Sequence, residues 1–110
     1  MLEEHLFPGE KLYLQRKRAK QTMLQSALGY GVTLHRYRRW EQDLRVWSDP
    51  EPPEVTLGGL EPWEHYIVLR LRSKMRQVDL ANKLGMSRNT IVRMEQGKSP
   101  LKRLIAFWGE

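Results

Sequence analysis

The sequence of 110 residues contains no cysteine, so it can form neither a disulfide framework nor a zinc site built on thiolates. Its longest apolar run is residues 104–108, far short of the ~20 residues of a membrane helix, and its amino terminus has no signal-peptide core. No stretch alternates apolar and polar residues as a half-buried strand does. These absences predict a soluble, cytoplasmic, all-α protein without a membrane partner.

Acidic residues are few relative to basic ones. The sequence has 13 aspartates and glutamates against 19 lysines and arginines, and the formal net charge of +6 favours a polyanionic partner. The basic residues form two blocks, because residues 11–39 contain no acid and residues 70–93 contain only Asp79. Solvated helix faces are the alternative explanation of such charge runs.

The two basic blocks are related by an internal repeat. Residues 6–43 align with residues 60–97 at an offset of 54 without a gap, and eleven of the 38 pairs are identical. The identical pairs are Leu6/Leu60, Pro8/Pro62, Glu10/Glu64, Arg16/Arg70, Arg18/Arg72, Lys20/Lys74, Ala27/Ala81, Gly31/Gly85, Arg39/Arg93, Glu41/Glu95 and Gln42/Gln96. The sequence therefore predicts two copies of one unit, in residues 1–47 and 61–110.

Residues 48–60 lie between the copies and contain three prolines and two glycines. These residues cannot continue a helix, so they predict a linker, whose proline-rich first half makes it a semi-rigid spacer. Fully extended, the twelve residues 48–59 span about 40 Å at ~3.3 Å each.

Each copy is predicted to form short helices, most clearly in the second copy. Proline, glycine and serine positions predict helices over residues 61–73, 77–84 and 88–96, with a fourth that Pro100 opens. Apolar spacing predicts that Val78, Ala81 and Leu84 form one buried stripe and that Ile91 and Met94 face inward. Trp40 aligns with Met94, which favours a core position.

An eight-residue helix, a turn containing glycine and a second helix describe a helix-turn-helix. Residues 77–100 resemble the Cro/repressor-type, or Xre-like, helix-turn-helix family. The family pattern is met at Gln77, Leu80-Ala81, Leu84-Gly85, Ser87, Thr90-Ile91, Glu95, Gly97 and Pro100. The first copy fits at Gly31, Thr33, Arg39, Trp40 and Glu41, but it has Met23 for the glutamine and Asp43 for the closing glycine. The resemblance implies two tandem, lambda repressor-like helical domains that bind DNA.

The resemblance also implies roles for individual residues. A recognition helix presents its amino-terminal residues to base edges in the major groove, where arginine suits guanine, asparagine suits adenine and leucine can touch a thymine methyl. The candidate base-contacting residues are Arg88, Asn89 and Arg93 in the second copy and Leu34, His35 and Arg39 in the first. The candidate backbone-contacting residues are Gln77, Ser87, Thr90, Lys98, Thr33, Arg36 and Arg38. Exposed surface without a ligand is the alternative, and the first copy has the further alternatives of holding only phosphates or of mediating dimerisation.

Both copies retain an arginine in the first helix and a glutamate near the end of the third. In the family such residues pair beneath the recognition helix, so we expect the structural ion pairs Arg16–Glu41 and Arg70–Glu95.

These features predict a sequence-specific regulator of transcription that binds double-stranded DNA, most simply a repressor from a bacterium or a phage. It would lie at the nucleoid, or in the host cytoplasm if a phage encodes it. Two modules one turn of B-DNA apart are separated by about 34–36 Å, which the linker can span, so one chain can imitate a dimer. A homodimer would offer four modules. No metal site, cofactor or catalytic frame is indicated, because His5, His35 and His65 lack metal-ligand spacing and no Ser/His/Asp arrangement is present.

Two other functions remain open. An antitoxin would bind a toxin as its partner and repress its own operon, and the end-binding part of a transposase would also carry paired helix-turn-helix units. RNA binding is disfavoured because the major groove of A-form RNA is too narrow for a recognition helix.

Overall fold

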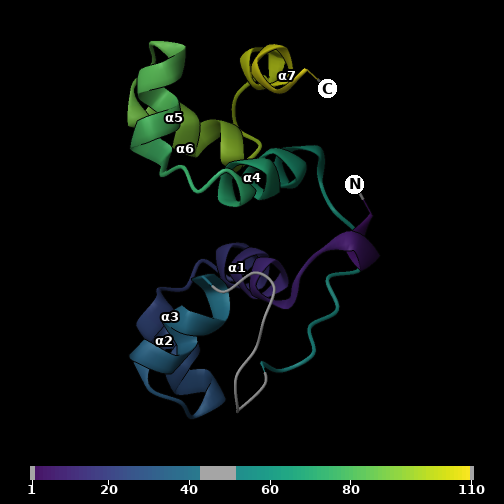
Figure 1. The fold of residues 1–110 in the computed structure, drawn as a ribbon, viewed down its shortest axis with the longest axis vertical. Helices are drawn as coiled ribbons and strands as arrows, with labels where there is room; N and C mark the ends of the chain where they lie inside the picture. The colour runs from purple at the N-terminus through teal and green to yellow at the C-terminus, as the bar shows by residue number, and fades with distance from the viewer. Residues whose placement is uncertain (1, 43–51, 110) are drawn as a thin grey trace. The chain divides into compact units, whose positions relative to one another are not determined.

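The computed structural model describes residues 2–42 and 52–109, and the chain divides into two compact units, residues 1–59 and 60–110 (Figure 1). Every regular element among the described residues is helical, which confirms the predicted all-α class. The predicted end of the first copy at residue 47 and the first part of the predicted linker, residues 48–51, lie outside the described residues. None of the described helices has the length and apolar character needed to cross a membrane.

The first unit contains the short 3-10 helix η1 (Glu3–His5) and the helices α1 (Pro8–Arg18), α2 (Met23–Tyr30) and α3 (Leu34–Gln42) (Figure 1). The α2 helix begins where the Thr22 hydroxyl accepts the Gln25 N–H at 3.1 Å, which satisfies a donor that the helix cannot satisfy itself. It ends at Gly31, whose φ of +70° is accessible to glycine without strain.

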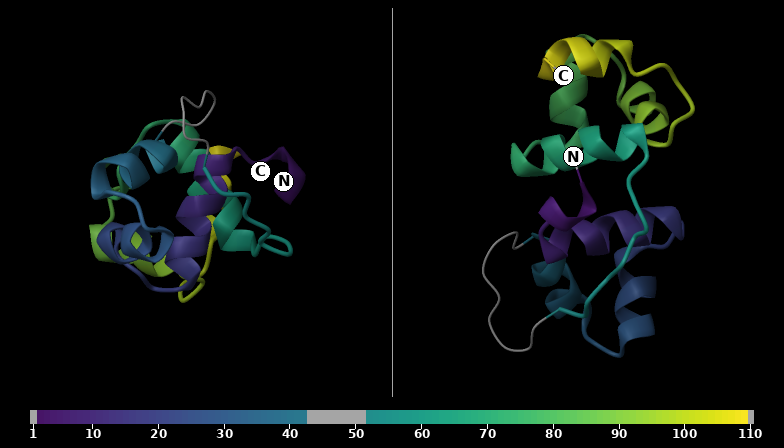
Figure 2. Two further views of the ribbon diagram at one scale, coloured as in Figure 1. Left: turned by 90° about the horizontal axis from the view of Figure 1, so that it is seen from below. Right: turned by 90° about the vertical axis from the view of Figure 1, so that its right-hand side faces the viewer.

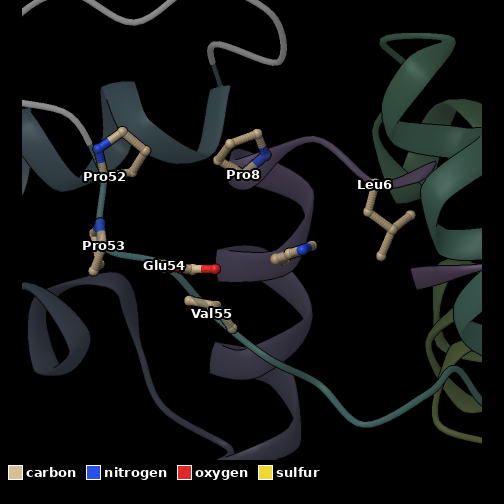
Figure 3. A pocket seen from close by; sticks show the side chains of 7 residues that line it. Leu6, Pro8, Pro52, Pro53, Glu54 and Val55 are labelled. Atoms are coloured by element: carbon tan, nitrogen blue, oxygen red, sulfur yellow. The ribbon is translucent and has the colours of Figure 1, made fainter. Parts of the chain in front are cut away.

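The core of the first unit includes one residue from the predicted linker. Leu12, Ala27, Tyr37 and Trp40 are buried together with Val55, which is only 4% exposed. Val55 belongs to residues 52–59, here called the closing segment. Figure 3 shows Glu54 and Val55 beside α1, and a cavity of about 300 Å³ is lined by residues of this segment and of the start of α1. The described part of the predicted linker is therefore packed on the first unit.

Two charged side chains hold the end of the closing segment. The Glu3 carboxylate accepts the backbone N–H groups of Leu57, of Gly58 at 2.9 Å and of Gly59 at 3.1 Å. The Arg18 guanidinium donates to the carbonyl oxygens of Leu57 at 2.7 Å and of Gly59 at 2.6 Å. Both glycines have positive φ, +78° and +116°, which lets successive N–H groups converge on one carboxylate.

The second unit contains α4 (Pro62–Arg72), α5 (Gln77–Leu84), α6 (Arg88–Glu95) and α7 (Lys102–Trp108), which Figure 2 shows from two further directions. The predicted bounds of the first three helices hold to within one residue, because proline and glycine mark where helices start and stop. The fourth helix begins at Lys102, two residues after Pro100.

The core of the second unit consists of Tyr66, Leu80, Ala81, Ile91, Met94 and Leu104. The inward positions predicted for Ile91 and Met94 are confirmed, as is the one predicted for Trp40 in the first unit. The stripe predicted on α5 is partly wrong, because Val78 is 37% exposed and Leu80 is fully buried. The 3.6-residue period of a helix is compatible with burial of either Val78 or Leu80 beside Ala81 and Leu84. The rotation of α5 against the core decides which of the two is buried.

The helices of the two units follow the 54-residue offset of the sequence alignment. The first residues of α1, α2 and α3 each precede those of α4, α5 and α6 by 54 positions. The units differ in the element that follows: the second unit adds α7, whose Leu104 is fully buried, whereas the first unit adds the closing segment with Val55.

Candidate nucleic-acid interface

The turn between α5 and α6 determines where α6 begins. Gly85 ends α5 in the left-handed conformation with φ +67°, and Ser87 has extended backbone. The Ser87 hydroxyl accepts the Thr90 N–H at 3.3 Å and lies 3.0 Å from the Thr90 hydroxyl oxygen. This cap places Arg88 and Asn89 in the first turn of α6, the position from which a helix can reach into a groove.

The two faces of α6 differ in chemistry. Ile91 and Met94 are at most 4% exposed, whereas Arg88, Asn89 and Arg93 are exposed. The outer face therefore offers two guanidinium groups and one carboxamide to a ligand.

A buried ion pair fixes α6 to α4. Arg70 Nε lies 2.6 Å from Glu95 Oε2 and Arg70 Nη2 lies 3.0 Å from Glu95 Oε1, so the two side chains form a two-pronged, charge-assisted contact. Both side chains are at most 5% exposed. Arg70 Nη1 also donates to the Met75 carbonyl oxygen at 3.0 Å, which ties the turn between α4 and α5 to the same pair.

Gln77 joins this ion pair. Its Nε2 donates to Glu95 Oε1 at 3.0 Å, and the residue is half-buried at the first position of α5. Gln77, which was expected to face the DNA backbone, therefore uses one amide hydrogen to bind the buried Arg70–Glu95 pair.

The first unit has the equivalent ion pair, with a different third partner. Arg16 Nε lies 2.7 Å from Glu41 Oε2, and Arg16 Nη2 lies 3.0 Å from Glu41 Oε1. Here the further residue that interacts with the carboxylate is Tyr37 of α3. Burial and the hydrogen bond to Glu41 both raise the pKa of Tyr37 above its ordinary value.

The outer face of α3 is more basic than that of α6. His35, Arg36, Arg38 and Arg39 are exposed, whereas Leu34 is half-buried. The Thr33 hydroxyl accepts the Arg36 N–H at 3.2 Å and so lies at the start of the helix, as Ser87 does in α6. The candidate contact residues of the first unit thus lie on one helix and its entry turn.

Lys98 lies in the turn that follows α6. Its side chain is exposed, and its backbone N–H donates to the Arg93 carbonyl oxygen at 2.9 Å, which folds the turn back against the helix. An interaction missed in the sequence lies at the other end of the motif, where Arg103 Nη2 of α7 donates to the Leu84 carbonyl oxygen at 2.7 Å. No local pattern marks such a contact, because it joins residues 19 positions apart.

Residues 68–106 match a family model described as helix-turn-helix. The matched range lies wholly within the second unit, runs from α4 into α7, and includes all of α5, the Gly85 turn and α6. The chain has no significant match among curated proteins or among solved structures.

Proposed function

We propose that the chain is a transcriptional regulator that binds double-stranded DNA sequence-specifically through two helix-turn-helix units and represses a promoter by covering it. The observation that carries this proposal is the outer face of α6. Arg88 and Asn89 are exposed in the first turn of a helix whose other face is core, within the range that matches the helix-turn-helix model. Such a helix enters the major groove with its amino-terminal residues against the bases.

Each exposed residue of α6 has a role suited to its chemistry. Arg88 pairs in bidentate fashion with O6 and N7 of a guanine, and Asn89 pairs with N6 and N7 of an adenine. Arg93, about one turn later, reads a neighbouring base.

The residues around α6 position it on the phosphates. Ser87, Thr90 and Lys98 are next to the first turn or in the turn that follows the helix, from which they contact the backbone without reading sequence. Gln77 uses one amide hydrogen on Glu95 and directs the other to a phosphate oxygen.

The first unit acts as the second reading module in this proposal. Three observations support the assignment: the helix starts that follow the 54-residue offset, the equivalent Arg16–Glu41 pair, and the exposed basic residues of α3. Leu34, His35 and Arg39 then contact bases, while Thr33, Arg36 and Arg38 hold phosphates.

A role as an antitoxin is a second candidate, and one surface favours it. Leu24 and Leu28 are 53% and 69% exposed one turn apart on α2, and an apolar surface of this kind is suited to a protein partner. A toxin that copurifies in stoichiometric amount would support this function, whereas a homodimer in sedimentation analysis would assign the surface to a second copy of the chain.

The proposal is tested by selecting duplexes from a random pool with the full chain. We expect an enriched motif, and we expect a reporter promoter that contains this motif to be silenced by the protein. The Lys98→Ala variant should bind all duplexes more weakly and lower the slope of affinity against salt by about one. A pool without enrichment would refute the proposal, and increased reporter expression would exclude the repressor role.

A further inference from the structure

We infer that Lys20 and Lys74 are phosphate-contacting residues, one in each unit, held for this purpose on strained turns. The inference rests on the proposed DNA binding and adds to it two contacts that the sequence pattern does not indicate.

Both lysines adopt a backbone conformation that disfavours any residue except glycine. Lys20 has φ +55° and Lys74 has φ +56°, and they are the non-glycine residues with positive φ in the described ranges. At every other described position with positive φ the chain has glycine. A lysine in the left-handed region is strained, so stability alone favours glycine at both positions.

The turns themselves use only the backbone of these residues. The Lys74 N–H donates to the Leu71 carbonyl oxygen at 3.0 Å, and the Lys20 N–H donates to the Lys17 carbonyl oxygen at 3.1 Å. Glycine could make the same two bonds. The side chain is therefore what distinguishes lysine from the unstrained alternative, and it is exposed in both units.

Favourable interaction with a helix dipole does not account for both lysines. Besides the arginines that pair with Glu41 and Glu95, the last turn of α1 already contains Lys17 and Arg18, and the last turn of α4 contains Arg72. These unstrained cations supply the positive charge that a helix carboxyl end favours, so a further cation at a strained position adds little for the helix.

The turn that carries each lysine is attached to the buried ion pair. In the second unit the Met75 N–H donates to the Arg70 carbonyl oxygen at 3.2 Å, while Arg70 Nη1 donates back to the Met75 carbonyl oxygen at 3.0 Å. In the first unit Gln21 makes the same two bonds with Arg16, at 3.1 Å and 3.3 Å. Because Arg70 also binds Glu95 of α6, the backbone of the turn has a fixed position relative to the proposed recognition helix.

This attachment links the turn of Lys74 to two segments that carry other proposed phosphate contacts. Lys74 follows Arg70 by four residues, and Lys98 follows Glu95 by three, so the two lysines lie on the segments that the ion pair joins. Lys74 also precedes Gln77 by three residues. The proposed contact of Lys74 therefore adds to those proposed for Gln77 and Lys98, and a fixed attachment of the backbone reduces the entropy lost on binding.

The decisive variants are Lys74→Gly and Lys20→Gly. Relief of strain should raise the melting temperature, whereas loss of a phosphate contact should lower the affinity for DNA. We expect each variant to melt at the same temperature as the wild-type chain or higher, and to bind the selected duplex severalfold more weakly. Each should also lower the slope of log affinity against log salt by about 0.9, the value for one phosphate contact. The Lys74→Arg variant keeps the charge and should keep the slope.

The matched control is Lys102→Ala, which removes the same charge from an exposed position of α7. It should leave the salt slope unchanged. If Lys102→Ala lowers the slope as much as Lys74→Gly does, net charge explains the effect and the inference is wrong.

The inference and the proposed function fail in different ways. If Lys74→Gly and Lys20→Gly melt higher but bind the selected duplex with unchanged affinity and slope, the lysines do not contact phosphate, while the DNA-binding function stands. If only one variant is affected, the assignment is overturned for the other lysine. If the wild-type chain enriches no duplex, both proposals fall.

Discussion

In the first unit the Glu41 carboxylate interacts with a tyrosine as well as with its arginine. In the second unit the Glu95 carboxylate accepts a hydrogen bond from a glutamine as well as from its arginine. The two arginines that hold these carboxylates make the same set of bonds, including the one to the turn after the first helix of each unit. Tyr37 approaches from α3 itself, and Gln77 approaches from the start of α5. The ion pair is thus the common feature, and its third partner varies with the residue available nearby.

The elements that cover the two cores differ more. A fully buried leucine of helix α7 completes the second core, whereas Val55 of the closing segment contributes to the first. A core of three short helices therefore accepts either a helix or an extended segment, as long as an aliphatic side chain fills the gap. The two units therefore share the ion pair that holds the proposed recognition helix. They differ in the element that covers the core, which is α7 in the second unit and the closing segment in the first.

The largest effect is expected from breaking the shared ion pair. Glu95→Ala and Glu41→Ala each leave a buried arginine without its counter-charge, which should lower the free energy of unfolding by ~3–5 kcal/mol. Urea denaturation followed by circular dichroism measures this loss. A double variant, Arg70→Met with Glu95→Leu, should recover much of it because no charge remains buried. A thermally neutral Glu95→Ala would show that the pair does not support α6.

Gly97 distinguishes the second unit. Its φ is +75°, and a β carbon there would lie 2.7 Å from Cε3 of Trp63. Gly97→Ala should therefore cost about 1–3 kcal/mol through overpacking, in addition to backbone strain of ~1–2 kcal/mol.

The matched controls are Gly85→Ala and Gly31→Ala. Their φ values are +67° and +70°, and no atom outside the neighbouring residues lies within 4 Å of an added β carbon, so both should show only the strain. Equal destabilisation of all three variants in thermal melts would mean that Trp63 gives way.

Tyr37→Phe tests the third partner in the first unit. The phenol interacts with the buried Glu41 carboxylate, which raises its pKa, and a hydrogen bond to a charged group contributes ~1.5–3 kcal/mol. Gln77→Ala, its counterpart in the second unit, should cost less because Gln77 is half-buried. Chemical denaturation of the two variants ranks the two contacts, and a larger loss for Gln77→Ala would reverse the comparison.

Tyr37 should also make the stability of the first unit depend on pH. Because its pKa is raised in the folded state, the unfolded chain loses the phenol proton first, and stability should fall as the pH rises above ~10. Thermal melts between pH 9 and 11 should show a steeper decline for the wild-type chain than for Tyr37→Phe. If the melting temperatures of the two proteins decline in parallel, the raised pKa of Tyr37 does not contribute to the stability.

The smallest effect is expected at the closing segment. Backbone N–H groups of residues 57–59 hold the pKa of Glu3 below its usual value, so this contact weakens as acid protonates the carboxylate. Glu3→Gln should accelerate amide hydrogen exchange at Leu57, Gly58 and Gly59 while leaving exchange in α5 unchanged. Unaltered exchange at these three amides would show that Glu3 does not restrain the segment.

The sequence was sufficient for the features that depend on local chemistry. Pro62, Gly85 and Ser87 mark helix ends through their own backbone preferences. The alignment of the two copies singled out Arg70 and Glu95, and the family resemblance implied that they pair. The exposure of Arg88 and Asn89 follows from the same periodicity that buries Ile91 and Met94.

Features that depend on distant contacts could not be read in this way. Prolines and glycines show that residues 52–59 are not helical, but they do not show that Val55 enters a core. The choice between Val78 and Leu80 depends on how α5 is rotated against its neighbours. The engagement of Gln77 with Glu95 likewise follows from packing of the whole unit.

The α6 helix is proposed to read bases, and a second round of duplex selection tests this role directly. Selection with the wild-type chain should return a motif in two parts, and selection with Arg88→Ala should return the same motif with its guanine preference lost in one part only. A motif that is identical for both proteins would contradict the account, because the exposed arginine of α6 would then not read sequence.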